Sequence, residues 1–285
     1  MGEFELPPDH VGWTVANAIS DEAPLIAIPR TTVGIRQEGR PFVVADPTRA
    51  ICYAAGQPYR RSLLSGEGDR CSFITFSPRL AEEAAAPYES AGVSERATYR
   101  FPFVAADIEC QDYARHQRLR RAIAEGEADS DALRESLYWM VARVIASGYA
   151  GIDGTNVPRR RDATAAIHAD AVDSVRASIG RNLVAHEALD ELAAHAHLSP
   201  FHLARIFRER TGRSIHSYRT EIRLRASLGR IADGERLADV AAAVGFASHA
   251  HLTDRFRRAY GISPHVWRQQ MSRNVEASRP EAHIA

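Results

Sequence analysis

Two segments near the C-terminus of the chain repeat the same pattern. They read LDELAAHAHLSPFHLARIFRERTGRS, residues 189–214, and LADVAAAVGFASHAHLTDRFRRAYGIS, residues 237–263. Leu189 aligns with Leu237, an offset of 48, and Ser199 aligns with Ser248, an offset of 49, so the turn of the second copy is one residue longer. Each copy predicts a short apolar helix, a tight turn and a longer basic helix. A doubled helix-turn-helix unit indicates a DNA-binding protein.

The longer helix of the first copy has clear start and stop signals. Ser199 is a good N-cap, Pro200 suits the first helical position, and Gly212 can end the helix in a left-handed conformation. At ~100° per residue, the apolar side chains cluster on one face of this helix. The residues expected to be buried there are Leu203, Ile206 and Phe207.

The opposite face is expected to enter the major groove, with the start of the helix nearest the bases. Arg205 can read guanine through O6 and N7, and Phe201 can touch a thymine methyl group or a deoxyribose. Arg208 lies further along the helix and is expected to contact phosphate. The predicted DNA-contact residues of the first copy are Ser199, Pro200, Phe201, Ala204, Arg205 and Arg208.

The second copy follows the same geometry, with Leu252 and Phe256 directed inward. Asp254 takes the position of Arg205, and its carboxylate can accept from cytosine N4 or pair with Arg258 four residues on. Because the outward faces differ, we expect the first helix to carry most of the base discrimination. The predicted contact residues of the second copy are Ser248, His249, Ala250, Thr253 and Arg257.

Residues ~163–272 resemble the DNA-binding region of AraC/XylS-family transcription regulators. The two repeated segments carry the resemblance, together with SYRTEIRLRAS between them and the run FRRAYGISP followed by WR. The resemblance implies a seven-helix domain in which Phe201, Ala204 and Arg205 of one helix, and His249, Ala250 and Thr253 of the other, face the bases. It also implies a sequence-specific, effector-responsive regulator whose partners are double-stranded DNA and, for an activator, RNA polymerase.

Charge is distributed in agreement with this interpretation. Residues 1–154 carry 16 arginines and 22 acidic residues, a net charge of −6, and residues 155–285 carry 20 and 14, a net charge of +6. Only the second half is therefore expected to meet a polyanion. A predicted helix over residues 215–232 would span ~27 Å at ~1.5 Å per residue. Such a connector can place two recognition helices in successive major grooves, ~34 Å apart.

The N-terminal half predicts a different fold. Short runs rich in β-branched and aromatic residues alternate with turns over residues 1–100, and a helix with Ser77 as its cap is expected from Pro78 to Ala86. Two helices follow, over 107–125 and 130–147. The predicted fold class is α+β in two domains: a β-rich, cupin-like domain with a helical pair, then an all-α domain with two helix-turn-helix units. The predicted divisions are 1–148 for the effector domain, including dimerisation helices at about 107–148, then a linker at 149–162, the DNA-binding domain at 163–272 and a tail at 273–285.

A small-molecule effector would require a pocket among the strands. Its candidate lining residues are Phe42, Cys52, Tyr53, Cys71 and Phe73, and a solid apolar core would suit the same residues equally. Two of these cysteines leave thiol or soft-metal sensing open as an alternative. The helical HxH pairs point ~200° apart, and the N-terminal half has only two distant histidines, so we expect no metal site and no cofactor.

Other functions are less well supported by the residues. A DNA-repair methyl-acceptor enzyme would require an activated cysteine, and the three cysteines have few basic neighbours, so we expect no enzyme. A non-specific architectural protein would bind random DNA equally well. No stretch is long and apolar enough for a membrane helix, and no signal peptide is evident, so we expect a cytoplasmic protein that acts as a homodimer.

Overall fold

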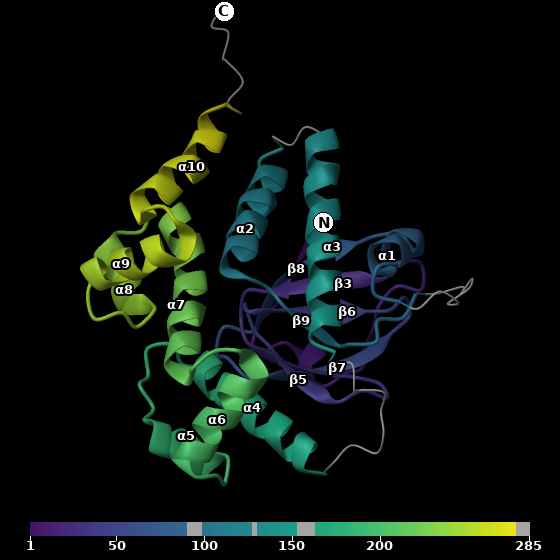
Figure 1. Ribbon diagram of the computed structural model, residues 1–285. Coiled ribbons are helices and arrows are strands. Elements are labelled where there is room, and N and C mark those ends of the chain that lie inside the picture. The colour runs from purple at the N-terminus through teal and green to yellow at the C-terminus, as the bar shows by residue number, and fades with distance from the viewer. Residues whose placement is uncertain (90–98, 127–129, 153–162, 278–285) are drawn as a thin grey trace, which may run out of the picture. The chain divides into compact units, whose positions relative to one another are not determined.

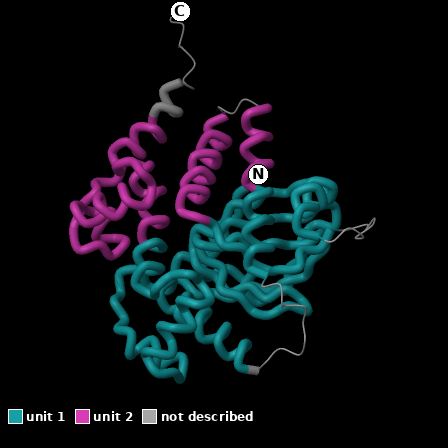
Figure 2. Tube along the Cα trace, in the orientation of Figure 1, with its two compact units in different colours: residues 1–108, 141–222 teal, residues 109–140, 223–285 magenta. Residues whose placement is uncertain are grey.

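The computed structural model describes residues 1–89, 99–126, 130–152 and 163–277. The chain divides into two compact units, residues 1–108 with 141–222 and residues 109–140 with 223–285 (Figure 2). Two helices, α3 (Ser130–Ala150) and α7 (Ile215–Ala232), contribute residues to both units. The predicted linker and tail fall outside the described residues from positions 153 and 278 onward, respectively.

Short strands from the first 107 residues pair into two antiparallel sheets, both within the first unit (Figure 1). Among the described residues, one sheet has the order β1 (Gly2–Leu6), β8 (Asp69–Thr75), β3 (Leu25–Pro29), β6 (Arg49–Tyr53) and β9 (Ala105–Asp107). The other has the order β2 (Asn17–Ala18), β7 (Pro58–Leu63), β4 (Val33–Gln37) and β5 (Phe42–Ala45). A 3-10 turn, Val11–Trp13, precedes β2.

Apolar side chains between the two sheets form their common core. In β4, Val33 and Ile35 are buried while Arg36 is exposed, as the alternation of a half-buried strand requires. This core draws on both sheets and contains Ala27, Val33, Ile35, Ala45, Ile51, Tyr53 and Val104. The prediction of a β-rich N-terminal part is therefore confirmed.

Among the described residues, three α-helices come from the N-terminal half. The first, α1 (Pro78–Ala85), begins where predicted, and the side chain of Ser77 accepts a hydrogen bond from the Leu80 N–H. The second, α2 (Cys110–Ala124), begins three residues later than predicted because Asp107 pairs with Arg49 as the last residue of β9. The third is α3, whose apolar stripe includes Met140, Val141, Val144 and Ile145, all buried.

Seven helices occupy the described residues from 163 to 277. They are α4 (Ala163–Arg181), α5 (Leu189–His195), α6 (Pro200–Thr211), α7, α8 (Leu237–Ala243), α9 (His249–Tyr260) and α10 (Pro264–Ala277). In the first unit, α4, α5, α6 and the start of α7 share one buried apolar core. None of the helices formed by the described residues contains a segment long and apolar enough to cross a membrane.

Candidate nucleic-acid interface

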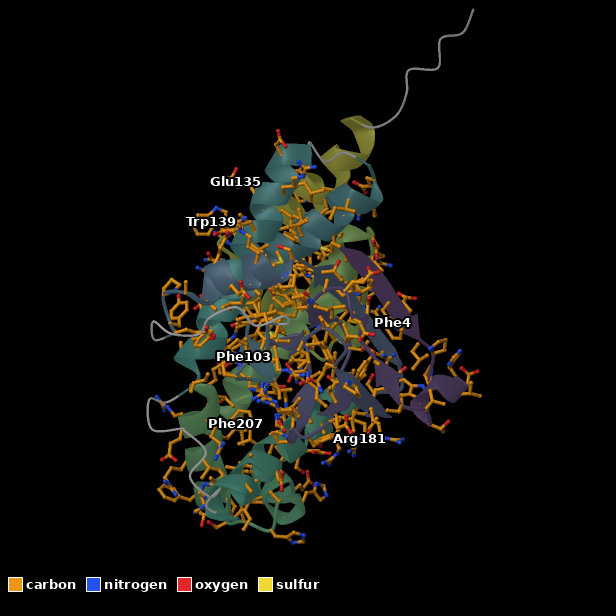
Figure 3. The ribbon with its side chains drawn as sticks, turned by 90° about the vertical axis from the view of Figure 1, so that its right-hand side faces the viewer. Phe4, Phe103, Glu135, Trp139, Arg181 and Phe207 are labelled. Carbon is orange, nitrogen blue, oxygen red and sulfur yellow. The ribbon has the colours of Figure 1, made fainter. Side chains whose placement is uncertain are left out.

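The first predicted recognition helix is α6, and its local sequence sets both of its ends. The hydroxyl of Ser199 accepts a hydrogen bond from the His202 N–H at 3.3 Å, and Pro200 occupies the first turn. Gly212 ends the helix with φ of 68°, a left-handed conformation that costs glycine little. Leu203, Ile206 and Phe207 are fully buried, as predicted, and Figure 3 labels Phe207 among the helices.

The opposite face of α6 is open to solvent. Phe201 is 81% exposed, the highest value among the large apolar side chains of the described residues. Arg205 and Arg208 are exposed, and Ala204 is half-buried. An exposed phenyl ring beside two guanidinium groups is a surface suited to a partner that offers apolar edges and phosphates.

The sequence did not lead us to expect an ion pair on this face. Nη1 of Arg205 lies 2.8 Å from Oε1 of Glu209, one turn further along α6. Both side chains are about half exposed, so the pair contributes only a few tenths of a kcal/mol to the helix. Because this pair is weak, Arg205 can leave Glu209 at little cost in free energy.

The second predicted recognition helix, α9, repeats this construction. The hydroxyl of Ser248 accepts from the His251 N–H at 3.1 Å, and Gly261 ends the helix with φ of 74°. Leu252 and Phe256 are fully buried. Four of the five predicted contact residues, all except Ser248, line a shallow hollow on this helix. The hollow is lined by His249, Ala250, Thr253, Asp254, Arg257, Arg258 and Gly261.

The carboxylate of Asp254 pairs within its own helix. Its Oδ1 lies 3.1 Å from Nη2 of Arg258, one of the two arrangements that the sequence left open. Asp254 is the one acidic residue that lines the hollow. Its pairing with Arg258 lowers the repulsion between its carboxylate and a phosphate backbone. Arg257 is also exposed on this helix.

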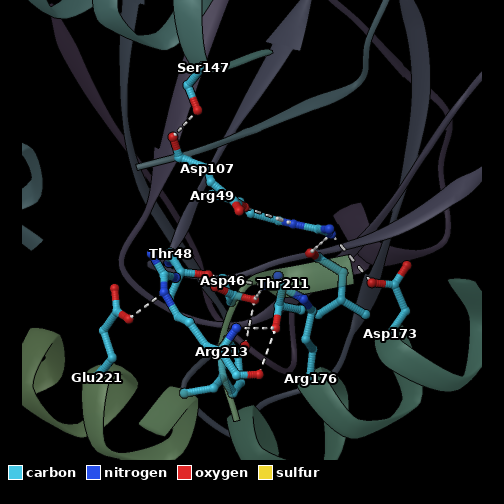
Figure 4. A network of polar contacts seen from close by, with 12 residues as sticks. Asp46, Thr48, Arg49, Asp107, Ser147, Asp173, Arg176, Thr211, Arg213 and Glu221 are labelled. Atoms are coloured by element: carbon cyan, nitrogen blue, oxygen red, sulfur yellow. Dashed lines mark hydrogen bonds and ion pairs between the residues drawn. The ribbon is translucent and has the colours of Figure 1, made fainter. Parts of the chain in front are cut away.

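A buried polar network holds the first helix-turn-helix in its unit (Figure 4). Asp46 follows β5, Arg176 lies on α4, and their side chains are 0% and 1% exposed. Oδ2 of Asp46 accepts from Nη1 of Arg176 at 2.8 Å and from the hydroxyl of Tyr218 on α7 at 2.7 Å. Oδ1 accepts from both the N–H and the hydroxyl of Thr48, at 2.7 and 2.6 Å. All four acceptor positions of this carboxylate are thus filled.

The electrostatics of the network favour its charged form. Burial by itself would raise the pKa of Asp46, but the Arg176 guanidinium and the Thr48 hydrogen bond outweigh it and lower the pKa to about 2. A second pair, Arg49 with Asp173 on α4 at 3.4 Å, lies alongside. There, burial raises the pKa of Asp173 against the effect of Arg49. The β-rich part is therefore joined to α4 and α7, the helices on either side of the first helix-turn-helix, through one fully buried ion pair and one that is partly exposed.

The second helix-turn-helix has its own anchor in the second unit. The guanidinium of Arg225 on α7 lies over the ring of Tyr113 on α2 at 5.0 Å, and that of Arg118 lies over Trp267 on α10 at 5.4 Å. Nη1 of Arg121 contacts the Ala232 carbonyl at 3.4 Å. Each helix-turn-helix therefore packs against a different piece of the N-terminal half. Sequence periodicity missed both anchors because their partners lie more than 100 residues apart.

The five candidate effector residues do not share one face. Tyr53 and Cys71 contribute to the core between the sheets, and strand alternation places Phe73 on the side of Cys71. Cys52 is buried on the opposite face of β6 from Tyr53. Phe42 lies beneath the guanidinium of exposed Arg36, 5.5 Å from its ring centre. An effector pocket between the sheets would therefore involve Tyr53, Cys71 and Phe73 rather than all five.

Polar side chains that the sequence analysis did not single out accompany Tyr53 and Cys71. Arg61 and Asp69 are buried and lie 3.6 Å apart. The guanidinium of Arg61 stacks over Phe4 at 4.2 Å, and it also contacts Tyr59. Burial raises the pKa of both the Cys71 and the Cys52 thiol, so neither has the low pKa of a reactive cysteine.

Comparison with known proteins bears on the helical part of the chain. Residues 192–270 match the model of a helix-turn-helix domain family. The chain carries an AraC-type helix-turn-helix domain. It is a DNA-binding transcription regulator, and double-stranded DNA is the partner of this domain. No match was found among the curated proteins.

Several solved structures are similar to this regulator. A DNA-binding transcriptional dual regulator from Escherichia coli K-12 is 25% identical, over 36% of this chain and 93% of that one, with a TM-score of 0.34. ToxT from Vibrio cholerae O395 is 12% identical, over 95% of this chain and 97% of that one, with a TM-score of 0.36. The DNA-binding domain of AdpA, in complex with a target DNA, is 27% identical over 39% and 98%, with a TM-score of 0.33.

Proposed function

We propose that the regulator reads its operator with the outward faces of α6 and α9. One observation carries this proposal: both helices are capped by a serine, bury one apolar face completely and leave the opposite face exposed. The bases would be contacted by Phe201, Ala204, Arg205, His249, Ala250 and Thr253. Contacts near the helix starts would come from Ser199, Pro200 and Ser248, and phosphate contacts from Arg208 and Arg257.

We propose that α6 provides most of the sequence discrimination. A guanidinium can contact guanine at two atoms, which is worth about 1–3 kcal/mol against the wrong base. Asp254, at the equivalent position of α9, is engaged with Arg258. The connector α7 is helical over the predicted range, and its 18 residues correspond to ~27 Å. This length supports recognition of two successive major grooves.

An experiment that separates these roles compares Arg205→Ala with Arg208→Ala. Operators are first selected by genome-wide affinity sequencing with the purified full-length protein, and affinities are then measured at one fixed salt concentration. Arg205→Ala should relax the preference at one base pair, while Arg208→Ala should weaken all sequences alike. Arg79→Ala, on the exposed surface of α1, is the control and should change neither.

Two results would overturn the proposal. An unchanged sequence preference in Arg205→Ala would remove its base-reading role. Equal affinity of the unaltered protein for selected and random DNA would favour a non-specific architectural protein instead.

We further propose that the β-rich, cupin-like part receives a small-molecule effector and transmits its binding to the first helix-turn-helix. The buried contacts of Asp46 with Arg176 and Tyr218 support this coupling, because the same carboxylate touches both α4 and α7. A displacement of the β5–β6 turn would break contacts to both helices at once. The effector site would lie near Tyr53 and Cys71.

We propose that the protein acts as a cytoplasmic homodimer through residues 107–148, and that it is an activator that contacts RNA polymerase. Two large aromatic side chains on the first half of α3 support dimerisation. Tyr138 is 43% exposed, and Trp139, labelled in Figure 3, is 55% exposed. Light scattering of Trp139→Glu should report a monomer, with Arg134→Glu as a control on the same helix. A dimer that persists in Trp139→Glu would show that the interface lies elsewhere.

We propose no catalytic activity, in keeping with the raised thiol pKa values of Cys52 and Cys71.

A further inference from the structure

Two histidines face each other beside the first turn of α6. His168 lies on α4 and His202 on α6, and both are half-buried within the same unit. Their Nε2 atoms are 3.3 Å apart. The ring centres are 5.3 Å apart, and the ring planes are inclined at 63°. The two residues are 34 positions apart in sequence and match no ligand-spacing motif.

This geometry fits two imidazoles that share one metal ion. Nitrogen atoms bound at ~2.05 Å to a tetrahedral Zn²⁺ ion, with an angle of ~109° at the metal, lie about 3.35 Å apart. With each ring centre ~1.15 Å behind its nitrogen, the centres then lie about 5.2 Å apart. Both observed distances agree with these values. Without a metal, one Nε2–H can donate to the other Nε2 at this distance, so the same two rings can form a hydrogen bond in the free protein.

The two helices hold the imidazoles in place. Near the other end of α6, Nη2 of Arg210 donates to the Ala165 carbonyl of α4 at 2.8 Å. The two helices also share one buried apolar core, which includes Val172 of α4 and Leu203 and Phe207 of α6. The backbone N–H of His202 is fixed by the Ser199 cap. A pair of ligands on two packed helices is preorganised, so little conformational entropy is lost when a metal binds.

We propose that His168 and His202 form a two-histidine site for a divalent transition-metal ion, with Cu²⁺ bound more tightly than Zn²⁺. Imidazole nitrogen selects these ions over Mg²⁺ and Ca²⁺, which prefer oxygen. Within the described ranges no group of three or more His, Cys, Asp or Glu residues forms a metal cluster, so water completes the coordination. A bound ion links the first turn of α6, which carries Phe201, to α4.

The test uses the full-length chain without a histidine tag. Zn²⁺ and Cu²⁺ binding is measured by isothermal titration calorimetry, and Cu²⁺ coordination by electron paramagnetic resonance. We expect one equivalent of either ion, with a copper spectrum that reports two nitrogen ligands. His168→Gln and His202→Gln should each weaken binding by at least about tenfold, because one of two protein ligands is lost. Glutamine keeps a hydrogen-bonding side chain in the helix interface.

The controls separate this site from other histidines. His216→Gln removes an exposed imidazole on α7, and His195→Gln with His197→Gln removes the HxH pair in the turn. Both should bind the metal as the unaltered protein does. Far-ultraviolet circular dichroism in EDTA checks that each variant is folded, and the copper spectrum of the unaltered protein tests the ligand set without any substitution. Absence of metal binding in the unaltered protein would overturn the proposal, as would full binding by His168→Gln or His202→Gln.

Discussion

Replacement of Asp46 by asparagine tests the buried network directly. The carboxylate receives four donors, from Arg176, Tyr218 and the N–H and hydroxyl of Thr48, at 2.6 to 2.8 Å. Asparagine offers one acceptor oxygen, and its NH₂ group must face two of these donors. Arg176, which is 1% exposed, then has no carboxylate at this position.

The expected loss of stability is large for one substitution. Removal of one partner of a buried ion pair costs about 3–5 kcal/mol, because the other charge stays buried without compensation. The lowered pKa of Asp46 agrees in direction with such a loss. A shift from 3.8 to about 2 corresponds to roughly 2 kcal/mol that favours the charged form in the folded protein, and the larger expected loss adds the cost of leaving Arg176 buried without its partner.

The measurement is urea-induced unfolding of Asp46→Asn, Arg176→Met and the double variant, followed by circular dichroism. Each single variant should lose about 3–5 kcal/mol, and the double variant should lose less than the sum, because it leaves no lone charge. The matched control is Arg79→Ala, which breaks an ion pair whose side chains are 86% and 52% exposed. It should lose about 0.5 kcal/mol or less. A loss below about 1 kcal/mol in Asp46→Asn, or strict additivity in the double variant, would refute this reasoning.

Three further predictions follow from individual residues. Because the folded-state pKa of Asp46 is lowered to about 2, its contribution is present above pH ~4 and is lost as pH falls toward 2; acid unfolding of Asp46→Asn should therefore show a weaker dependence on pH in this window. Gly261→Ala places an alanine at φ of 74°, with no neighbour within 4 Å of the new Cβ. Backbone strain alone should therefore lower the free energy of unfolding by about 1–2 kcal/mol, measured by thermal unfolding. Gly66→Ala is the control: its Cβ is equally free of neighbours and its φ is not in the left-handed region, so it should cost little. Iodoacetamide at pH 8 should modify Cys52 slowly in the native protein and quickly in urea, because burial raises the pKa of its thiol; fast native labelling by mass spectrometry would contradict this burial.

Local sequence signals predicted the recognition helices well. A serine before the helix, a proline in its first turn and a glycine after its end determine the limits of α6, since each residue acts within a few positions of itself. Helical periodicity likewise identified Leu203 and Phe207, and Leu252 and Phe256, as buried. For residues 1–100 the sequence predicted β-structure, from short runs of β-branched and aromatic residues separated by turns, but not which strands pair.

Strand pairing limited the prediction of the candidate effector site. Phe42 and Cys52 were both expected to face a pocket, yet neither lies on the face that carries Tyr53 in the core between the sheets. A shift of one position reverses the direction of a side chain in a strand, and register depends on the partner strand rather than on the strand itself. Asp107, predicted to begin a helix, is instead the last residue of β9, because its backbone pairs with that of Arg49 on β6.

Local signals were enough to predict two capped helix-turn-helix units, because these signals repeat within short segments of the chain. The contacts that hold each unit became visible in the folded chain. Asp46 meets Arg176 across 130 positions of sequence, Arg225 of α7 meets Tyr113 of α2, and His168 meets His202. Such contacts depend on how distant elements pack, and an isolated aspartate, arginine or histidine carries no local pattern that names its partner.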